Sequence, residues 1–212
     1  MAKQYGIKLI EVLTGFKFIG QKMLEFETKK NGTYLFGFEE SYGCLIGTHA
    51  RDKDAIVATM ALCEAAAYYK SLDMTLWDAM IDVYEKYGYY VDDIKTLTLK
   101  GIDGLEQIQK IMTHLKNNTP TEIAGYKVLW ARNYDNDTAT NMVNKAVVPT
   151  GLPKSNVVYY ELEGGAWLCV RPSGTEPKIK FYYGVVGKNI EEAQELSGKF
   201  GDAVLKMIEY ML

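Results

Sequence analysis

The residues most able to do chemistry lie in one short polar loop, Arg171-Pro-Ser-Gly-Thr-Glu-Pro-Lys178, which separates two apolar runs. A phosphate dianion needs converging donors, nearby positive charge and a backbone that can approach closely. The Arg171 guanidinium can bond two phosphate oxygens at once, and Lys178 adds a second cation. Ser173 and Thr175 supply hydroxyl donors, and Gly174 can adopt positive φ, which lets successive backbone N–H groups face an anion. The loop therefore predicts a phosphate-binding site.

A plain hairpin loop is the other interpretation of the same residues. Proline, serine and glycine are ordinary turn residues. The flanking runs, residues 166–170 and 179–185, have the composition of two strands that such a turn would connect. Short motifs also match by chance. The loop by itself leaves both interpretations open.

Four motifs, in a fixed order, extend the pattern over nearly the whole chain. They are Thr14-Gly-Phe-Lys-Phe-Ile19, Gly37-Phe-Glu-Glu-Ser41, Arg51-Asp-Lys-Asp54 and the Arg171–Lys178 loop. Together they resemble the C-terminal part of the α-phosphohexomutases, most of all the phosphoglucomutases and phosphomannomutases, from the end of domain 3 through domain 4. The resemblance implies that the last loop holds the phosphate of a hexose phosphate. It also implies that Glu39 and Ser41 bind sugar hydroxyls, which are donors that need fixed acceptors.

Three further residues are possible substrate contacts by the same resemblance. Lys17 matches a lysine that approaches the substrate in the family, although most lysines on a helix are simply solvated. His49 and Arg51 either contact the ligand or brace the loop that contains Glu39. His114 lies in an amphipathic helical pattern, and we assign it no role.

Two family motifs are absent from the sequence. It contains neither a Ser-His-Asn-Pro loop, whose serine carries the transferred phosphoryl group in the family, nor an Asp-Gly-Asp-x-Asp-Arg loop, which binds magnesium. We therefore expect no catalytic residue and no metal ligand in this chain. The intact enzyme, by resemblance, uses Mg²⁺ and glucose 1,6-bisphosphate.

These absences lead to a functional expectation. We expect a C-terminal fragment, inactive alone, that contributes phosphosugar recognition to the reversible interconversion of glucose 1-phosphate and glucose 6-phosphate. Its partners would be a hexose phosphate and the missing N-terminal domains of the same enzyme. A stand-alone, non-catalytic phosphosugar-binding module is the alternative. A third possibility is that the isolated piece binds nothing. The Phe38-Glu-Glu-Ser41 form resembles glucose mutases more than glucosamine mutases, but one sequence does not separate glucose from mannose.

Composition narrows the class of protein. The chain has 212 residues, 48% of them hydrophobic, enough for one or two cores. A net charge of −3 does not indicate the basic surface that nucleic-acid binding requires. Three scattered cysteines fit neither a disulfide framework nor a zinc site. The sequence shows no signal segment, and its best apolar run, residues 55–63, is too short to span a bilayer. We expect a cytoplasmic protein that binds neither nucleic acid nor membrane.

The first expected domain, residues 1–94, reads as part of an α/β fold. A strand at 6–13 precedes a helix that Thr14 would cap, and a strand at 33–38 leads to Glu39. Helices then follow the Arg51–Asp54 motif and a capping box at Thr75. Strands alternating with helices favour a parallel sheet, so we expect a partial parallel-sheet domain that contains the sugar-recognition loop. An incomplete domain would also leave an edge strand or an apolar face uncovered, and self-association could follow.

The second expected domain, residues 95–212, reads as an α+β fold that contains the phosphate-binding loop. One helix is expected around residues 105–115, and a final helix follows a capping box formed by Asn189 and Glu192. The apolar runs between them predict an antiparallel sheet packed against these helices. A short strand is predicted at residues 95–100, before Gly101. The other predicted strands are residues 126–132, 157–162, 166–170 and 179–185, with a tight turn at 163–165.

Overall fold

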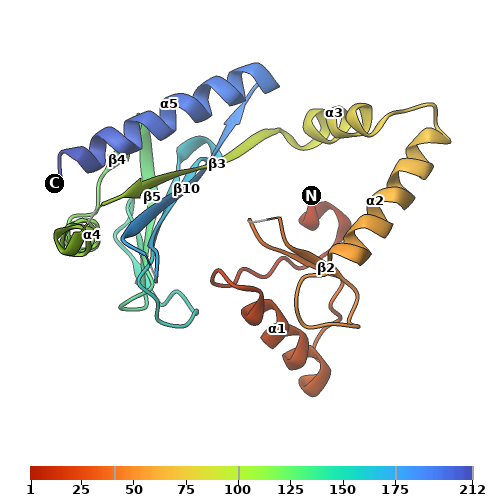
Figure 1. Ribbon diagram of the computed structural model, residues 1–212, viewed down its shortest axis with the longest axis horizontal. Helices are drawn as coiled ribbons and strands as arrows, with labels where there is room; N and C mark the ends of the chain where they lie inside the picture. Colours follow the sequence, from red (N-terminus) through yellow and green to blue (C-terminus); the bar gives the residue numbers. More distant parts are fainter. Residues whose placement is uncertain (41, 100, 175, 212) are drawn as a thin grey trace. The chain divides into compact units, whose positions relative to one another are not determined.

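The computed structural model describes residues 1–40, 42–99, 101–174 and 176–211 (Figure 1). The chain divides into two compact units, Met1–Lys86 and Tyr87–Leu212. The predicted boundary after residue 94 is wrong, because it falls inside strand β3 (Tyr89–Thr98). That strand pairs along its whole length with β10 (Lys178–Gly187). Its backbone hydrogen bonds therefore place all of β3 in the second unit.

The first unit consists mainly of helices. Its last helix begins with the predicted capping box, in which the Thr75 backbone N–H and hydroxyl both donate to Asp78 Oδ2, at 2.8 and 2.6 Å. The Asp78 backbone N–H donates back to the Thr75 hydroxyl at 3.1 Å. In chain order its elements are η1 (Ala2–Tyr5), α1 (Phe16–Lys29), β1 (Phe36–Phe38), β2 (Cys44–Ile46), α2 (Ala55–Lys70) and α3 (Leu76–Tyr87).

The strand pairing of the first unit differs from the expected parallel sheet. Its described strands, β1 and β2, pair antiparallel, with Phe36 opposite Ile46. Residues 6–13 were predicted as a strand but form none. A strand is held by backbone hydrogen bonds to a neighbour, and no described strand pairs with residues 6–13. Apolar composition alone was therefore not enough to form this strand.

Helix α1 begins one residue later than a Thr14 cap would require. Its N-cap is Gly15, at φ 122°, and no side chain caps this end of the helix. Because Gly15 stands between Thr14 and the first helical residue, the Thr14 hydroxyl is not at the capping position.

The first unit has a small core. Three of its residues, Phe16, Met23 and Leu45, form the buried cluster. Helix α2 has no buried residue, and the side chains of Ile56 and Met60 are 74% and 67% exposed. The expected exposed apolar surface is therefore present on this unit, whereas self-association stays a prediction.

The second unit contains an eight-stranded sheet, and all its described pairings are antiparallel. The strand order is β3-β10-β9-β8-β5-β6-β7, with β4 paired to β5. The strand predicted at residues 95–100 overlaps the end of β3, and the other four predicted strands are present as β5, β8, β9 and β10. Strands β4, β6 and β7 were not predicted, because they are short or polar. Besides β3 and β10, the elements are α4 (Gly101–Asn117), β4 (Glu122–Ile123), β5 (Tyr126–Asn133), β6 (Thr138–Asn141), β7 (Val147–Val148), β8 (Val158–Leu162), η2 (Glu163–Gly165), β9 (Trp167–Pro172) and α5 (Ile190–Glu209).

One continuous core fills the second unit. Alternate residues of the central strands point to the same face, where Leu168, Val170 and Phe181 are fully buried. Residues of α4 and α5 belong to this cluster, and α5 packs on β10 and β3 (Figure 1). The Asn189 side chain caps α5 by accepting from the Glu192 backbone N–H at 2.8 Å, as predicted. The Glu192 carboxylate completes the cap one residue earlier, by accepting from the Lys188 N–H at 2.6 Å.

Candidate functional site

The predicted phosphate loop connects two neighbouring strands at the centre of the second unit. It leaves β9 after Pro172 and enters β10 at Lys178, where Ile179 pairs with Pro172. The Ser173 backbone N–H donates to the Lys178 carbonyl at 2.7 Å, and the Leu99 N–H donates to the Pro177 carbonyl at 3.0 Å. Both ends of the loop are thus fixed by backbone hydrogen bonds.

Two cations face each other at the base of this loop. Arg171 on β9 is directly opposite Lys180 on β10, so the two side chains project from the same face of the sheet. Among the described residues, no carboxylate forms an ion pair with either of them. Like charges directly opposite in a sheet are destabilising, and an anion between them removes the repulsion. Sequence reasoning missed Lys180, although its alternation with Lys178 along a predicted strand was a usable signal.

The other predicted members of the phosphate site have mixed outcomes. Lys178 forms an ion pair with Glu176 of the same loop, Nζ to Oε1 3.1 Å, with the Glu176 side chain 56% exposed. Exposed pairs contribute about 0–1 kcal/mol, so a phosphate can displace this carboxylate. Gly174 does not adopt the positive φ that was anticipated, and no atom crowds its Cβ position. Thr175 lies outside the described residues.

A pocket of about 440 Å³ opens beside the loop. Arg171, Ser173 and Gly174 line one side of it. Leu105, Ile108 and Gln109 of α4 line another side, as do Ser155 and Asn156, which precede β8. Pro172 and Glu176 of the loop also line the pocket. The volume lies within the range of about 300–1,000 Å³ that is typical of small-molecule sites.

In the first unit, the predicted sugar-binding carboxylate is held by a lysine that sequence reasoning missed. Lys53 Nζ lies 3.1 Å from Glu39 Oε2, and only 10% of the Glu39 side chain is exposed. This hydrogen bond raises the pKa of Lys53. The loop closes through the Glu39 N–H, which donates to the Gly43 carbonyl at 2.7 Å, and a Cβ on Gly43 would lie 2.5 Å from the Lys53 side chain. Ser41 lies outside the described residues.

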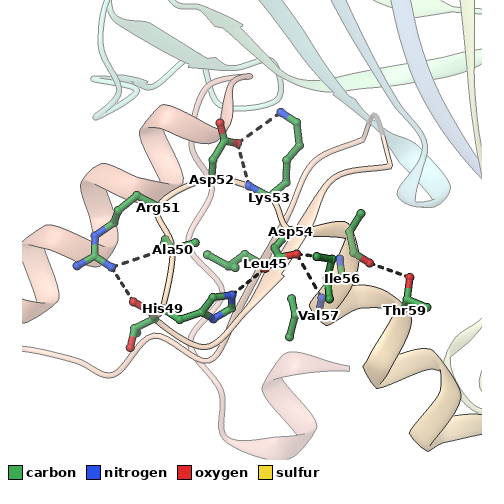
Figure 2. A network of polar contacts seen from close by, with 12 residues as sticks. Leu45, His49, Ala50, Arg51, Asp52, Lys53, Asp54, Ile56, Val57 and Thr59 are labelled. Atoms are coloured by element: carbon green, nitrogen blue, oxygen red, sulfur yellow. Dashed lines mark hydrogen bonds and ion pairs between the residues drawn. The ribbon is translucent and has the colours of Figure 1, made fainter.

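His49 and Arg51 both brace the segment that follows β2 (Figure 2). His49 Nε2 lies 2.9 Å from Asp54 Oδ2, while Asp54 Oδ1 caps α2 by accepting from the Ile56 and Val57 N–H groups. The bond to His49 is the main cause that lowers the pKa of Asp54. The Arg51 guanidinium donates to both oxygens of Glu27, each at 2.6 Å. These contacts brace the segment that follows β2, whereas bracing of the Glu39 loop and contact with a ligand both stay predictions for His49 and Arg51.

A second pocket, of about 750 Å³, lies against this braced segment. Lys17 of α1 lines it together with residues Ala50 to Ile56. Helix α1 approaches the segment closely, because a Cβ on Gly20 would lie 2.8 Å from the Arg51 carbonyl oxygen. The structure therefore brings Lys17 and Lys53 to the same pocket, whereas the Arg51 guanidinium is occupied by Glu27.

Within the part of the chain that the structure describes, no group of three or more His, Cys, Asp or Glu residues could hold a metal ion. No helix formed by the described residues is both long and apolar enough to cross a bilayer.

Comparison with known proteins defines the class. Residues 1–87 match the family model of the phosphoglucomutase/phosphomannomutase alpha/beta/alpha domain III, and residues 106–196 match the model of the C-terminal domain of the same family. The chain therefore belongs to the phosphoglucomutase/phosphomannomutase family. The description of the first model agrees with the α/β class expected for the first unit, and the antiparallel sheet packed with helices agrees with the α+β class expected for the second.

Individual relatives give the same result. The chain is 34% identical over 204 residues to a phosphoglucomutase of Staphylococcus epidermidis strain ATCC 35984, with 96% of the chain and 36% of the relative covered. It is 35% identical over 195 residues to a phosphoglucomutase of Staphylococcus aureus strain MSSA476, covering 92% of the chain and 35% of the relative. The chain thus spans about a third of the length of these relatives.

Proposed function

We propose that the chain is the phosphosugar-recognition part of a phosphoglucomutase, which interconverts glucose 1-phosphate and glucose 6-phosphate. Family membership and relatives with this name support the reaction class. In this proposal the second unit holds the phosphate that is not being transferred. The first unit recognises the hydroxyls of the sugar.

The observation that carries the proposal is the cross-strand pair of Arg171 and Lys180. Two cations held opposite each other, without a carboxylate partner among the described residues, are stabilised by a dianion between them. Ser173 adds a hydroxyl, and Lys178 adds a third cation when a phosphate displaces Glu176. Charge-assisted bonds contribute about 1.5–3 kcal/mol each, so a few of them give usable affinity.

Sugar recognition is assigned to the Glu39 loop. A carboxylate accepts hydrogen bonds from vicinal hydroxyls, and the Lys53 ammonium holds this carboxylate in place. Ser41 is retained as a sugar-binding residue from the family resemblance. Lys17, on the wall of the neighbouring pocket, is the further substrate contact that we propose.

Phosphoryl transfer itself is assigned to parts of the enzyme other than these 212 residues. The sequence has no phosphoserine motif, and the described residues offer no cluster that fits magnesium. We derive no step through Mg²⁺, and we assign glucose 1,6-bisphosphate to the whole enzyme. Positioning is a large part of phosphoryl-transfer catalysis, so binding residues can still govern the rate. The chain's proposed partners are a hexose phosphate and the remaining domains of the same enzyme.

A ligand panel tests the proposal on the purified chain. Thermal unfolding is followed with glucose 1-phosphate, inorganic phosphate and glucose. A ligand at one hundred times its Kd stabilises the folded state by about 2.7 kcal/mol. We expect the two phosphates to raise the melting temperature and glucose to leave it unchanged. Arg171→Ala should abolish both shifts, whereas the control Lys188→Ala, which removes a lysine 90% exposed, should preserve them. If the two phosphates still raise the melting temperature of Arg171→Ala, the phosphate site does not lie in this loop.

A stand-alone phosphosugar-binding module is the second candidate. The observation in its favour is that the loop, its pocket and a continuous core all belong to one unit. An activity assay separates the two candidates. We expect no mutase turnover by the purified chain, and turnover restored by the other domains would support the enzyme. Turnover by the chain alone would contradict both.

A further inference from the structure

The pocket beside the phosphate loop contains a polar group that the loop does not explain. Asn156 belongs to its wall, and the side-chain oxygen Oδ1 of Asn156 is buried. No described residue donates a hydrogen bond to this oxygen. Buried polar atoms are nearly always hydrogen-bonded in folded proteins, so an exception calls for a reason such as ligand binding.

The backbone holds Asn156 firmly in this position. The Ser155 N–H donates to the Tyr134 carbonyl at 3.1 Å, and the Tyr134 N–H donates to the Val157 carbonyl at 3.1 Å. Residues on both sides of Asn156 are therefore tied to the same neighbour. Immediately afterwards the chain enters β8 in the centre of the sheet. The side chain is presented by a rigid scaffold, which is the arrangement that a binding residue requires.

The chemistry of an amide oxygen selects the part of a ligand that it can bind. Oδ1 is an acceptor, and the oxygens of a phosphate dianion are acceptors too, so the two do not satisfy each other. A sugar hydroxyl is a donor and does satisfy it. The same pocket wall includes Leu105 and Ile108, whose apolar side chains suit the C–H groups of a sugar ring.

We infer that Asn156 is a sugar-binding residue, whose side-chain oxygen accepts a hydrogen bond from a hydroxyl of a hexose phosphate held by Arg171. This inference rests on the proposed function, because it requires the phosphate to occupy the Arg171 loop. In this inference the second unit recognises a sugar hydroxyl as well as the phosphate. The phosphate loop alone does not provide hydroxyl recognition. The ligand class is a phosphorylated polyol rather than any phosphate.

The test compares two probes on the 212-residue chain by calorimetric titration. Inorganic phosphate reports on the loop, and glucose 1-phosphate reports on the loop together with Asn156. Asn156→Leu keeps a similar volume and removes the acceptor. We expect it to weaken glucose 1-phosphate binding by about three- to ten-fold, the value of one ordinary hydrogen bond. Its affinity for inorganic phosphate should stay within about two-fold of the parent chain, by the same hydrogen-bond arithmetic.

Stability provides the second readout. An apolar side chain in place of an unpaired buried polar group should leave the melting temperature of the free chain unchanged or raise it. A fall in the melting temperature would mean that Asn156 bonds another part of the protein, and would overturn the inference. The matched control is Asn118→Leu, because Asn118 is exposed, bonds the His114 carbonyl and does not line the pocket. This variant should bind both probes as the parent chain does.

The outcomes separate this inference from the proposed function. If Arg171→Ala abolishes binding of both probes, the phosphate site is supported. If Asn156→Leu then binds glucose 1-phosphate as the parent chain does, Asn156 is not a sugar-binding residue. Equal weakening of both probes by Asn156→Leu would identify Asn156 as a support for the loop and would also overturn the inference. If the parent chain binds neither probe, both proposals fail.

Discussion

The phosphate loop and the Glu39 loop are held in place by different kinds of interaction. The phosphate loop joins two central strands, and the strand residues next to it, Val170 and Ile179, are fully buried. The Glu39 loop is held by an ion pair between Lys53, whose side chain is half exposed, and Glu39, whose side chain is 10% exposed. The segment after β2 is held by an exposed ion pair between Arg51 and Glu27. Beneath it lies a buried cluster of three residues, compared with the continuous core of the second unit.

This difference predicts how well each loop is pre-organised. Burial of a large apolar side chain contributes about 1.5–3 kcal/mol, whereas an exposed ion pair contributes about 0–1 kcal/mol. The anion site should therefore keep its geometry without ligand. The sugar loop should open more readily, because regions with few buried contacts have low local stability.

The largest expected effect comes from truncating the core of the second unit. Phe181 is fully buried on β10, and Phe181→Ala should cost about 3–5 kcal/mol in the free energy of unfolding. Hydrogen exchange resolved by residue would show faster exchange throughout β8 to β10. The counterpart in the first unit is Leu45→Ala, also at a fully buried position. Its effect should be confined to the first unit, and an equal loss of protection in β8 to β10 would contradict the independence of the two cores.

A smaller effect is expected at the N-terminus of α5. Asn189→Ala removes the cap of this helix and should lower the stability of the second unit by about 1 kcal/mol. Denaturant unfolding followed by circular dichroism measures the change. Asn189→Ser keeps a capping oxygen, so it should retain most of the stability. Equal losses in the two variants would mean that the cap contributes nothing.

The corresponding cap of α2 should depend on pH. The bond to His49 and those to the backbone hold the pKa of Asp54 below its ordinary value. A lowered folded-state pKa gives stability that is complete above the unfolded pKa of about 3.9 and is lost as pH falls through the folded value. Exchange of α2 amides should therefore accelerate below about pH 4, by this linkage, while the Asn189 amide does not titrate. Asp54→Asn should flatten this pH dependence, and an unchanged slope would rule out Asp54 as its source.

The smallest expected effect comes from the exposed braces. Arg51→Met removes the two bonds to Glu27 and should cost no more than about 1 kcal/mol, because both side chains are over 40% exposed. Raising the salt concentration should reduce the difference between the parent chain and the variant. A loss of several kcal/mol would show instead that this ion pair holds the first unit together.

Local sequence was sufficient for much of the fold. The capping boxes at Thr75 and Asn189 are present because a cap depends on residues three positions apart. The strands on both sides of the phosphate loop were also predicted correctly, since apolar runs next to turn residues are typical of hairpins. Residues 6–13 show the limit of this approach, because the same apolar signal produced no strand there, and none of the described strands pairs with them.

The sequence by itself identified the phosphate loop and the Glu39 turn, and with them the types of residue in the candidate site. It also indicated the family. Only the tertiary structure placed Lys180 opposite Arg171, Lys53 against Glu39, and Asn156 on the wall of a pocket that α4 completes. Strand register and helix packing decide these contacts. Both depend on hydrogen bonds and buried surfaces between segments far apart in the chain, which spacing along the sequence does not encode.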